Sequence, residues 1–93
     1  MDLEIEIASH YRFRFQPPQQ KWVGKSPDLM QKAVFAGEEM MAIQKSDDEP
    51  DQFELHFLGL VGTGFQSMEE AKQLAPAFAK EVFTYLAQMI EQH

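Results

Sequence analysis

The chain has 93 residues, no cysteine, and fifteen acidic against eight basic residues, which gives a formal net charge of −7. This length corresponds to one domain, and a chain of this size buries roughly 60–65% of its unfolded surface, enough for a modest core. The absence of cysteine excludes a disulfide framework and any cysteine-based zinc or redox site. The negative charge argues against nucleic acids and anionic membranes as partners, because both attract positively charged surfaces.

Residues 1–7 alternate between acidic and apolar types and lack the basic and then apolar order of a signal peptide. No run of the sequence approaches the roughly 20 apolar residues that a membrane-spanning helix requires. We therefore expect a cytoplasmic protein.

Residues 2–15 show the clearest strand pattern of the sequence. The side chains that fall on one face are Leu3, Ile5, Ile7, Ser9, Tyr11, Phe13 and Phe15. Charged residues dominate the alternate positions, and a period of two predicts a strand with one buried face and one solvated face. Fourteen residues is long for one strand, which favours a bend or bulge near residues 8–9.

Two prolines at residues 17–18 end this strand and form an extended connector. Ser26, Pro27 and Asp28 then match the first positions of a helix, and Gly37 matches the position that follows a helix. The sequence therefore predicts a short helix over residues 27–36. A strand through residues 32–35 is the alternative.

Residues 39–45 and 52–58 alternate in the manner of a β-hairpin, with Met41 and Ile43 on one side of the first arm. The connection is rich in turn formers and acids, and its carboxylates are Asp47, Asp48, Glu49 and Asp51. Its spacing lacks the alternating acids, glycine and closing glutamate of a calcium-binding EF-hand loop. We therefore expect a solvated acidic turn without a metal.

Glycines at 59, 62 and 64 precede the C-terminal segment. A glycine-rich loop before a helix can bind an anion, but residues 59–65 match neither the dinucleotide nor the P-loop motif. Two acids, Glu69 and Glu70, would also repel a phosphate from the first turn of the helix. We expect a structural crossover loop, and the sequence indicates no cofactor.

The C-terminal segment, from Met68 onward, reads as a long amphipathic helix. Ser67 and Glu70 fit a capping box, in which Ser67 accepts from the N–H of Glu70 and the Glu70 carboxylate accepts from the N–H of Ser67. Apolar residues recur at helical spacing as far as Met89. Pro76 lies inside the pattern, and it either kinks one helix or separates two; the unbroken apolar spacing favours one helix.

Together these elements predict a single α+β domain with the order β-α-β-β-α. A three-stranded, mainly antiparallel sheet is packed on one face by the long C-terminal helix. The expected core consists of Ile5, Ile7, Tyr11, Phe13, Ile43, Leu55, Phe57, Leu74, Phe78, Val82 and Leu86.

For function, the leading hypothesis is a non-catalytic protein-interaction module, such as an adaptor, inhibitor or immunity-type factor. Its partner, whose identity the sequence leaves open, would be held by the acidic turn or by an apolar flank of the helix that includes Phe83 and Ile90. The apolar residues left over from the expected core also favour a homodimer. No arrangement of nucleophile and base is recognisable, so we do not expect an enzyme.

The alternative hypothesis is a small-ligand-binding module. Its pocket would lie between Trp22, the glycine-rich loop and the long helix, and its candidate residues are Trp22, Gly62, Gly64 and Phe65.

Overall fold

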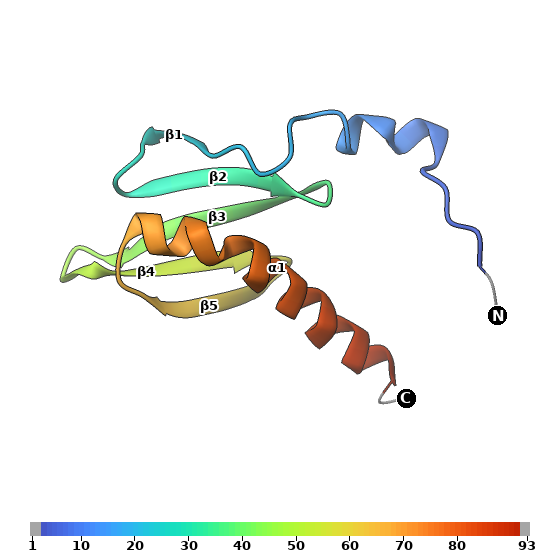
Figure 1. Cartoon of the computed structure of the whole chain (residues 1–93). Helices are drawn as coiled ribbons and strands as arrows, with labels where there is room; N and C mark the ends of the chain where they lie inside the picture. The colour runs from blue at the N-terminus through green and yellow to red at the C-terminus, as the bar shows by residue number, and fades with distance from the viewer. Residues whose placement is uncertain (1–2, 92–93) are drawn as a thin grey trace.

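Short turns connect five consecutive strands into one antiparallel sheet in the order β1-β2-β3-β4-β5, and a single long helix crosses one face of it (Figure 1). The structure is a computed structural model that describes residues 3–91. The strands are β1 (Val23–Ser26), β2 (Met30–Phe35), β3 (Glu38–Ser46), β4 (Glu49–Phe57) and β5 (Leu60–Phe65). The helix is α1 (Met68–Glu91), and a short 3-10 helix, η1 (Ser9–Arg14), precedes the sheet.

The expected three-stranded sheet with the order β-α-β-β-α is therefore wrong. The hairpin expected at residues 39–45 and 52–58 is present as β3 and β4, and the long helix begins at Met68 as expected. Three other segments differ: residues 3–15 lie outside the sheet, residues 30–35 form a strand, and residues 60–65 form another. Residue 2, the expected start of the first strand, lies outside the described residues.

The segment expected to be a helix is a turn followed by β2. The N–H of Leu29 donates to the carbonyl of Ser26 at 2.9 Å, which closes a β-turn over Pro27 and Asp28. Proline is favoured at the second position of such a turn, as it is at the first position of a helix. Ala36 and Gly37 then have positive φ angles of 53° and 79°, as in a two-residue type I′ hairpin turn. The same residue types therefore serve β-turns here rather than helix ends.

The glycine-rich segment is a strand because a second turn of the same kind precedes it. Leu58 and Gly59 have φ angles of 51° and 81°, and the chain returns along β4 with Phe57 opposite Leu60. The pairing slips between Phe53 and Leu55, where Gly64 adopts a φ of 90°. The glycines therefore shape a hairpin turn and a bulge.

The core lies between α1 and the inner face of the sheet. Its sheet residues are Ala33, Phe35, Met40, Ala42, Phe53, Leu55 and Phe57. Its helix residues are Met68, Ala71, Ala75, Ala79 and Val82. Three alanines at the centre of the helical stripe allow a close approach to the sheet, and the larger apolar side chains flank them. Of the expected core residues, only Leu55, Phe57 and Val82 are confirmed as buried among the described residues.

Other members of the expected core lie elsewhere. Ile5, Ile7, Tyr11 and Phe13 are exposed on a segment that does not reach the sheet, and Leu74 is 46% exposed beside the helical stripe. Phe78 and Leu86 are half-buried at the margin of the core. Ile43 is half-buried on the outer face of the sheet, because Met40 and Ala42, rather than Met41 and Ile43, face the helix.

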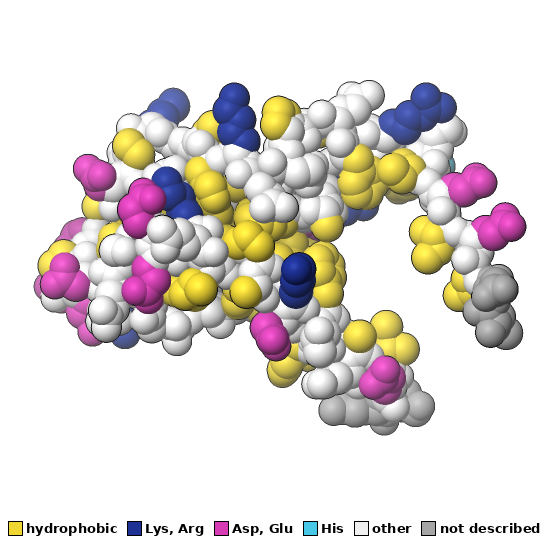
Figure 2. All heavy atoms as spheres, viewed as in Figure 1, with side chains coloured by type: hydrophobic (Ala, Val, Ile, Leu, Met, Phe, Trp, Pro, Cys, Tyr) yellow, Lys and Arg dark blue, Asp and Glu magenta, His cyan; other side chains and the backbone are white. Residues whose placement is uncertain are grey.

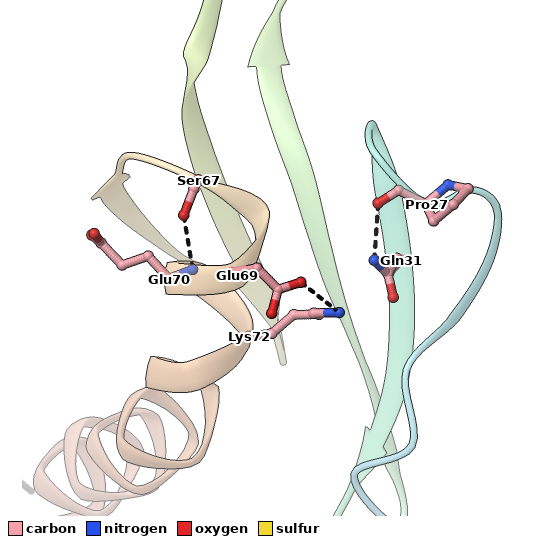
Figure 3. Close-up of polar contacts among 6 residues, drawn as sticks. All are labelled: Pro27, Gln31, Ser67, Glu69, Glu70 and Lys72. Carbon is pink, nitrogen blue, oxygen red and sulfur yellow. Dashed lines mark hydrogen bonds and ion pairs between the residues drawn. The ribbon is translucent and has the colours of Figure 1, made fainter.

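The start of α1 shows one half of the expected capping box (Figure 3). Ser67 Oγ accepts from the N–H of Glu70 at 3.0 Å, whereas the Glu70 carboxylate accepts from the N–H of Gln66 at 3.4 Å rather than from Ser67. Glu69 and Lys72 form an ion pair of 3.3 Å in the same turn. Pro76 lies inside one continuous helix, so the chain does not divide there.

Candidate interaction surfaces

The N-terminal arm, which we define as residues 3–14, carries apolar side chains that no part of the described chain covers. None of its residues is buried, and Ile5 is 90% exposed. Its other large exposed apolar side chains are Leu3, Ile7, Tyr11 and Phe13. The arm extends away from the sheet, first as η1 and then as an extended segment (Figure 1). An uncovered group of this size is typical of an interaction site.

The arm is fixed to the body at the turn between β2 and β3. Arg14 forms an ion pair with Glu38, and the Phe15 ring packs on Gly37, where a Cβ atom would lie 2.6 Å from it. The N–H of Gly37 donates to Oε1 of Gln19 at 3.2 Å. The arm is therefore anchored to the body at its C-terminal end, and the residues before Arg14 are free of these contacts.

The last part of α1, which we call the helix end (residues 83–91), extends beyond the sheet. Val82 is the last buried residue of the helix, and Leu86 is the only residue of 83–91 that is even half-buried. Phe83 and Ile90 are seven residues apart and therefore lie on the same side of the helix. Phe83 packs edge-on against Phe57 at 5.7 Å, and Ile90 is 77% exposed. The apolar stripe of α1 thus continues beyond the part of the sheet on which the helix packs.

The arm and the helix end project from the same end of the molecule. Figure 2 shows hydrophobic side chains on both, on either side of an open space. The turns at residues 36–37 and 58–59 also lie at this end, because alternate turns of an antiparallel sheet share an end. The arm and the helix end therefore form two apolar surfaces at the same end of the molecule.

The acidic turn lies at the opposite end of the sheet, between β3 and β4. Asp47, Asp48, Glu49 and Asp51 are all exposed there, and Glu49 pairs with Lys45 at 3.1 Å. The structure therefore does not bring the acidic candidates together with Phe83 and Ile90. They form two separate candidate surfaces, one acidic and one apolar.

A groove of about 430 Å³ runs between β5 and α1. Its apolar lining comprises Leu60, Val61, Phe78, Val82 and Tyr85, and its polar lining comprises Glu81, Thr84 and Gln88. Gly62 faces the helix here, since a Cβ atom at this position would lie 2.7 Å from the Phe78 ring. The missing side chain of Gly62 therefore makes room for Phe78.

The residues expected to form a ligand pocket are not all beside this groove. Gly62, Gly64 and Phe65 belong to β5, and Phe65 is half-buried against the core. Trp22 precedes β1 at the other edge of the sheet and packs against Phe35, with ring centres 5.8 Å apart. The structure therefore separates Trp22 from the glycines by the width of the sheet.

The polar groups offer little chemistry within residues 3–91. His56 Nε2 lies 3.0 Å from Oε1 of Glu54 on the outer face of the sheet, and no three potential ligands gather there or elsewhere among the described residues. The helices of this part of the chain include none with the length and apolar character needed to cross a membrane.

Comparison with protein-family models, curated proteins and solved structures finds no significant match to this chain. The function of the chain is therefore inferred from its own residues. Sequence reasoning missed the exposed arm. It placed a candidate pocket between residues 59–65 and the long helix, where the groove lies, but it also included Trp22, which lies at the other edge of the sheet. The sequence contains no signal that the arm is exposed, because its alternation is typical of a strand. Leu60 and Val61, between Gly59 and Gly62, were a usable signal for the groove.

Proposed function

We propose that this chain is a non-catalytic protein-interaction module that holds a protein partner on its helix end. The observation that carries the proposal is the continuation of the apolar stripe of α1 beyond Val82, where the sheet covers it only in part. Phe83, Met89 and Ile90 are all exposed there. An uncovered amphipathic helix gains stability when a partner buries its apolar face, because most helical stability in proteins comes from such packing.

The acidic turn supplies a second, electrostatic contribution. Its carboxylates are part of the net charge of −7, and the turn lies at the far end of the molecule from the helix end. Charge of this kind raises the association rate of a basic partner more than it raises the affinity. An adaptor or an inhibitor of the immunity type combines an apolar contact surface with a charged one. We also propose that the protein acts in the cytoplasm.

A small ligand in the groove between β5 and α1 is the weaker candidate. The volume falls in the range of ligand pockets, but such pockets usually enclose most of their ligand. Val61 and Tyr85, on opposite walls of the groove, are each about half exposed. Open walls favour an extended polypeptide over a small molecule.

Affinity capture with three matched baits tests the proposal. Ile90→Asp introduces a charge on the helix end, and Gln73→Asp introduces the same charge on the exposed side of α1 where the helix crosses the sheet. A third bait replaces Asp47, Asp48 and Asp51 by asparagine. We expect the Gln73→Asp bait to retain the partner, the Ile90→Asp bait to lose it, and the asparagine bait to bind more slowly at low salt.

The proposal fails if Ile90→Asp captures the same proteins as the native chain with the same yield. Equal capture by the native and asparagine baits at low and high salt would mean that the acidic turn does not contribute to binding. The helix end would then be the only proposed contact surface.

A further inference from the structure

We propose that two copies of this chain exchange their N-terminal residues. In this dimer, residues 3–8 of each copy, the donor segment, add to the free edge of β5 in the other copy as a sixth strand. Leu3, Ile5 and Ile7 then enter the groove beneath α1. This inference does not depend on the proposed function, because it uses only the side of the helix end that faces β5, with Tyr85, and it uses neither Phe83, Ile90 nor the acidic turn.

The donor segment has the pattern of a strand but no strand to pair with in its own copy. Its apolar residues alternate with Glu4 and Glu6, so that an extended chain would present three apolar side chains on one face. It is neither helix nor strand in the single chain, and η1 separates it from the anchored end of the arm. Six residues of strand span about 20 Å, which matches the six residues of β5.

Apart from the bulge at Gly64, the edge of β5 lacks the usual protection against strand addition. No strand lies beyond β5 in the described part of the chain, and residues 60–65 contain no charge and no proline. Natural sheets commonly protect an open edge with lysine, proline or a very short strand. β1, the other edge, has only four residues, includes Lys25, and continues from a segment in which Gln20 is hydrogen-bonded to Val34. β5 is therefore the receptive edge.

The groove supplies an apolar surface at the position where a sixth strand would place its inner side chains. Leu60 and Val61 line the strand side, and Phe78, Val82 and Tyr85 line the helix side. Every second residue of an added strand points to this side of the sheet. In this arrangement Leu3, Ile5 and Ile7 would cover Tyr85, which is 52% exposed in the single chain.

A second copy is the occupant that the chain itself indicates. Each copy carries one donor segment and one receptive edge, and in a single chain the two remain apart. The radius of gyration of 15.2 Å exceeds the roughly 12 Å expected for a compact domain of this length. The Arg14–Glu38 ion pair and the packing of Phe15 on Gly37 fix the arm where η1 leads it away from the sheet (Figure 1). Reciprocal exchange gives the β5 edge of each copy a partner strand, and it closes the assembly with twofold symmetry.

Light scattering on the native chain and three variants tests this dimer. Ile5→Asp places a charge on the apolar face of the donor segment, and Glu6→Gln is its control on the opposite face. Tyr85→Lys blocks the groove, and it places the new positive charge four residues after Glu81, a spacing that is favourable on a helix. We expect twice the chain mass of 10.7 kDa for the native chain and for Glu6→Gln. Ile5→Asp and Tyr85→Lys should each raise the dimer dissociation constant more than about 100-fold, because each change occurs twice in the symmetric dimer.

Mixing the two disruptive variants tests the exchange itself. An Ile5→Asp chain retains its groove and a Tyr85→Lys chain retains its donor segment, so one of the two contacts can form in a mixed dimer. We expect the mixture to associate more tightly than either variant alone. Far-UV circular dichroism should show that both variants keep the helix, since Ile5 and Tyr85 are exposed.

A monomeric native chain at high micromolar concentration would overturn the proposal, whether the donor segment is free or folds back onto its own β5. A dimer that survives Ile5→Asp would also overturn it. Ile90→Asp should leave the dimer intact. Loss of the dimer with Ile90→Asp but not with Ile5→Asp would overturn the exchange while leaving the helix end as an interaction surface.

Discussion

Side chains of the same type contribute unequally to the stability of this fold, because their contribution depends on burial rather than on residue type. Leu55 is fully buried between the sheet and α1, whereas Leu74 lies beside the helical stripe and is 46% exposed. Helical periodicity alone placed Leu74 in the core together with the residues of the true stripe. The three alanines at 71, 75 and 79 occupy the closest part of the contact, which moves Leu74 to the margin.

Truncation of these two leucines distinguishes the two positions. We expect Leu55→Ala to lower the free energy of unfolding by about 2–5 kcal/mol, since it leaves a cavity in the core. Leu74→Ala should cost less than about 1 kcal/mol, because much of its side chain already contacts water. Urea unfolding followed by circular dichroism measures both. Equal losses would contradict the placement of Leu74 outside the core.

The cap of α1 is a second feature that depends on one side chain. Ser67 Oγ accepts from the N–H of Glu70 at 3.0 Å. We expect Ser67→Ala to lower the free energy of unfolding by about 1 kcal/mol, because this N–H then loses its partner. Ser46→Ala, on an exposed part of β3 where the Ser46 hydroxyl makes no hydrogen bond to another described residue, is the control. An unchanged stability in Ser67→Ala would show that water replaces the hydroxyl fully.

At the scale of the elements, the sequence specified those whose patterns have one interpretation. The long helix and the hairpin of β3 and β4 follow from an extended apolar period and from alternation around an acidic turn. β2 did not follow, because serine, proline and aspartate at 26–28 begin a helix or a β-turn equally well. The inner face of β3 was also undetermined, because Met40, Met41, Ala42 and Ile43 are apolar on both faces.

Pro76 interrupts the hydrogen bonds of α1 without ending the helix. Proline lacks the N–H that an interior position donates and crowds the preceding turn. We expect Pro76→Ala to raise the free energy of unfolding, by up to about 3 kcal/mol. Ala77→Gly, one residue further on the exposed side, should lower it by about 1 kcal/mol. A loss of stability in Pro76→Ala would mean that the ring makes a packing contact that outweighs the missing bond.

At the scale of the whole molecule, the chain has two ends of different character. One end carries the acidic turn, and the other carries the N-terminal arm and the helix end. The principal extents of 50 × 32 × 18 Å describe a flat and elongated body. The candidate site was only partly predictable. The sequence indicated the apolar flank of the helix, but alternation in residues 3–15 has the same form whether the partner strand belongs to this chain or to another.

Amide hydrogen exchange over a range of protein concentration is the sharpest test of whether residues 3–8 pair only between copies. At low concentration we expect these residues to exchange as fast as an unfolded chain while β2, β3 and β4 are protected. As the concentration rises, protection should appear at residues 3–8 and along β5 together. Protection of residues 3–8 that is already present at the lowest concentration, or absent at the highest, would be inconsistent with pairing between copies alone.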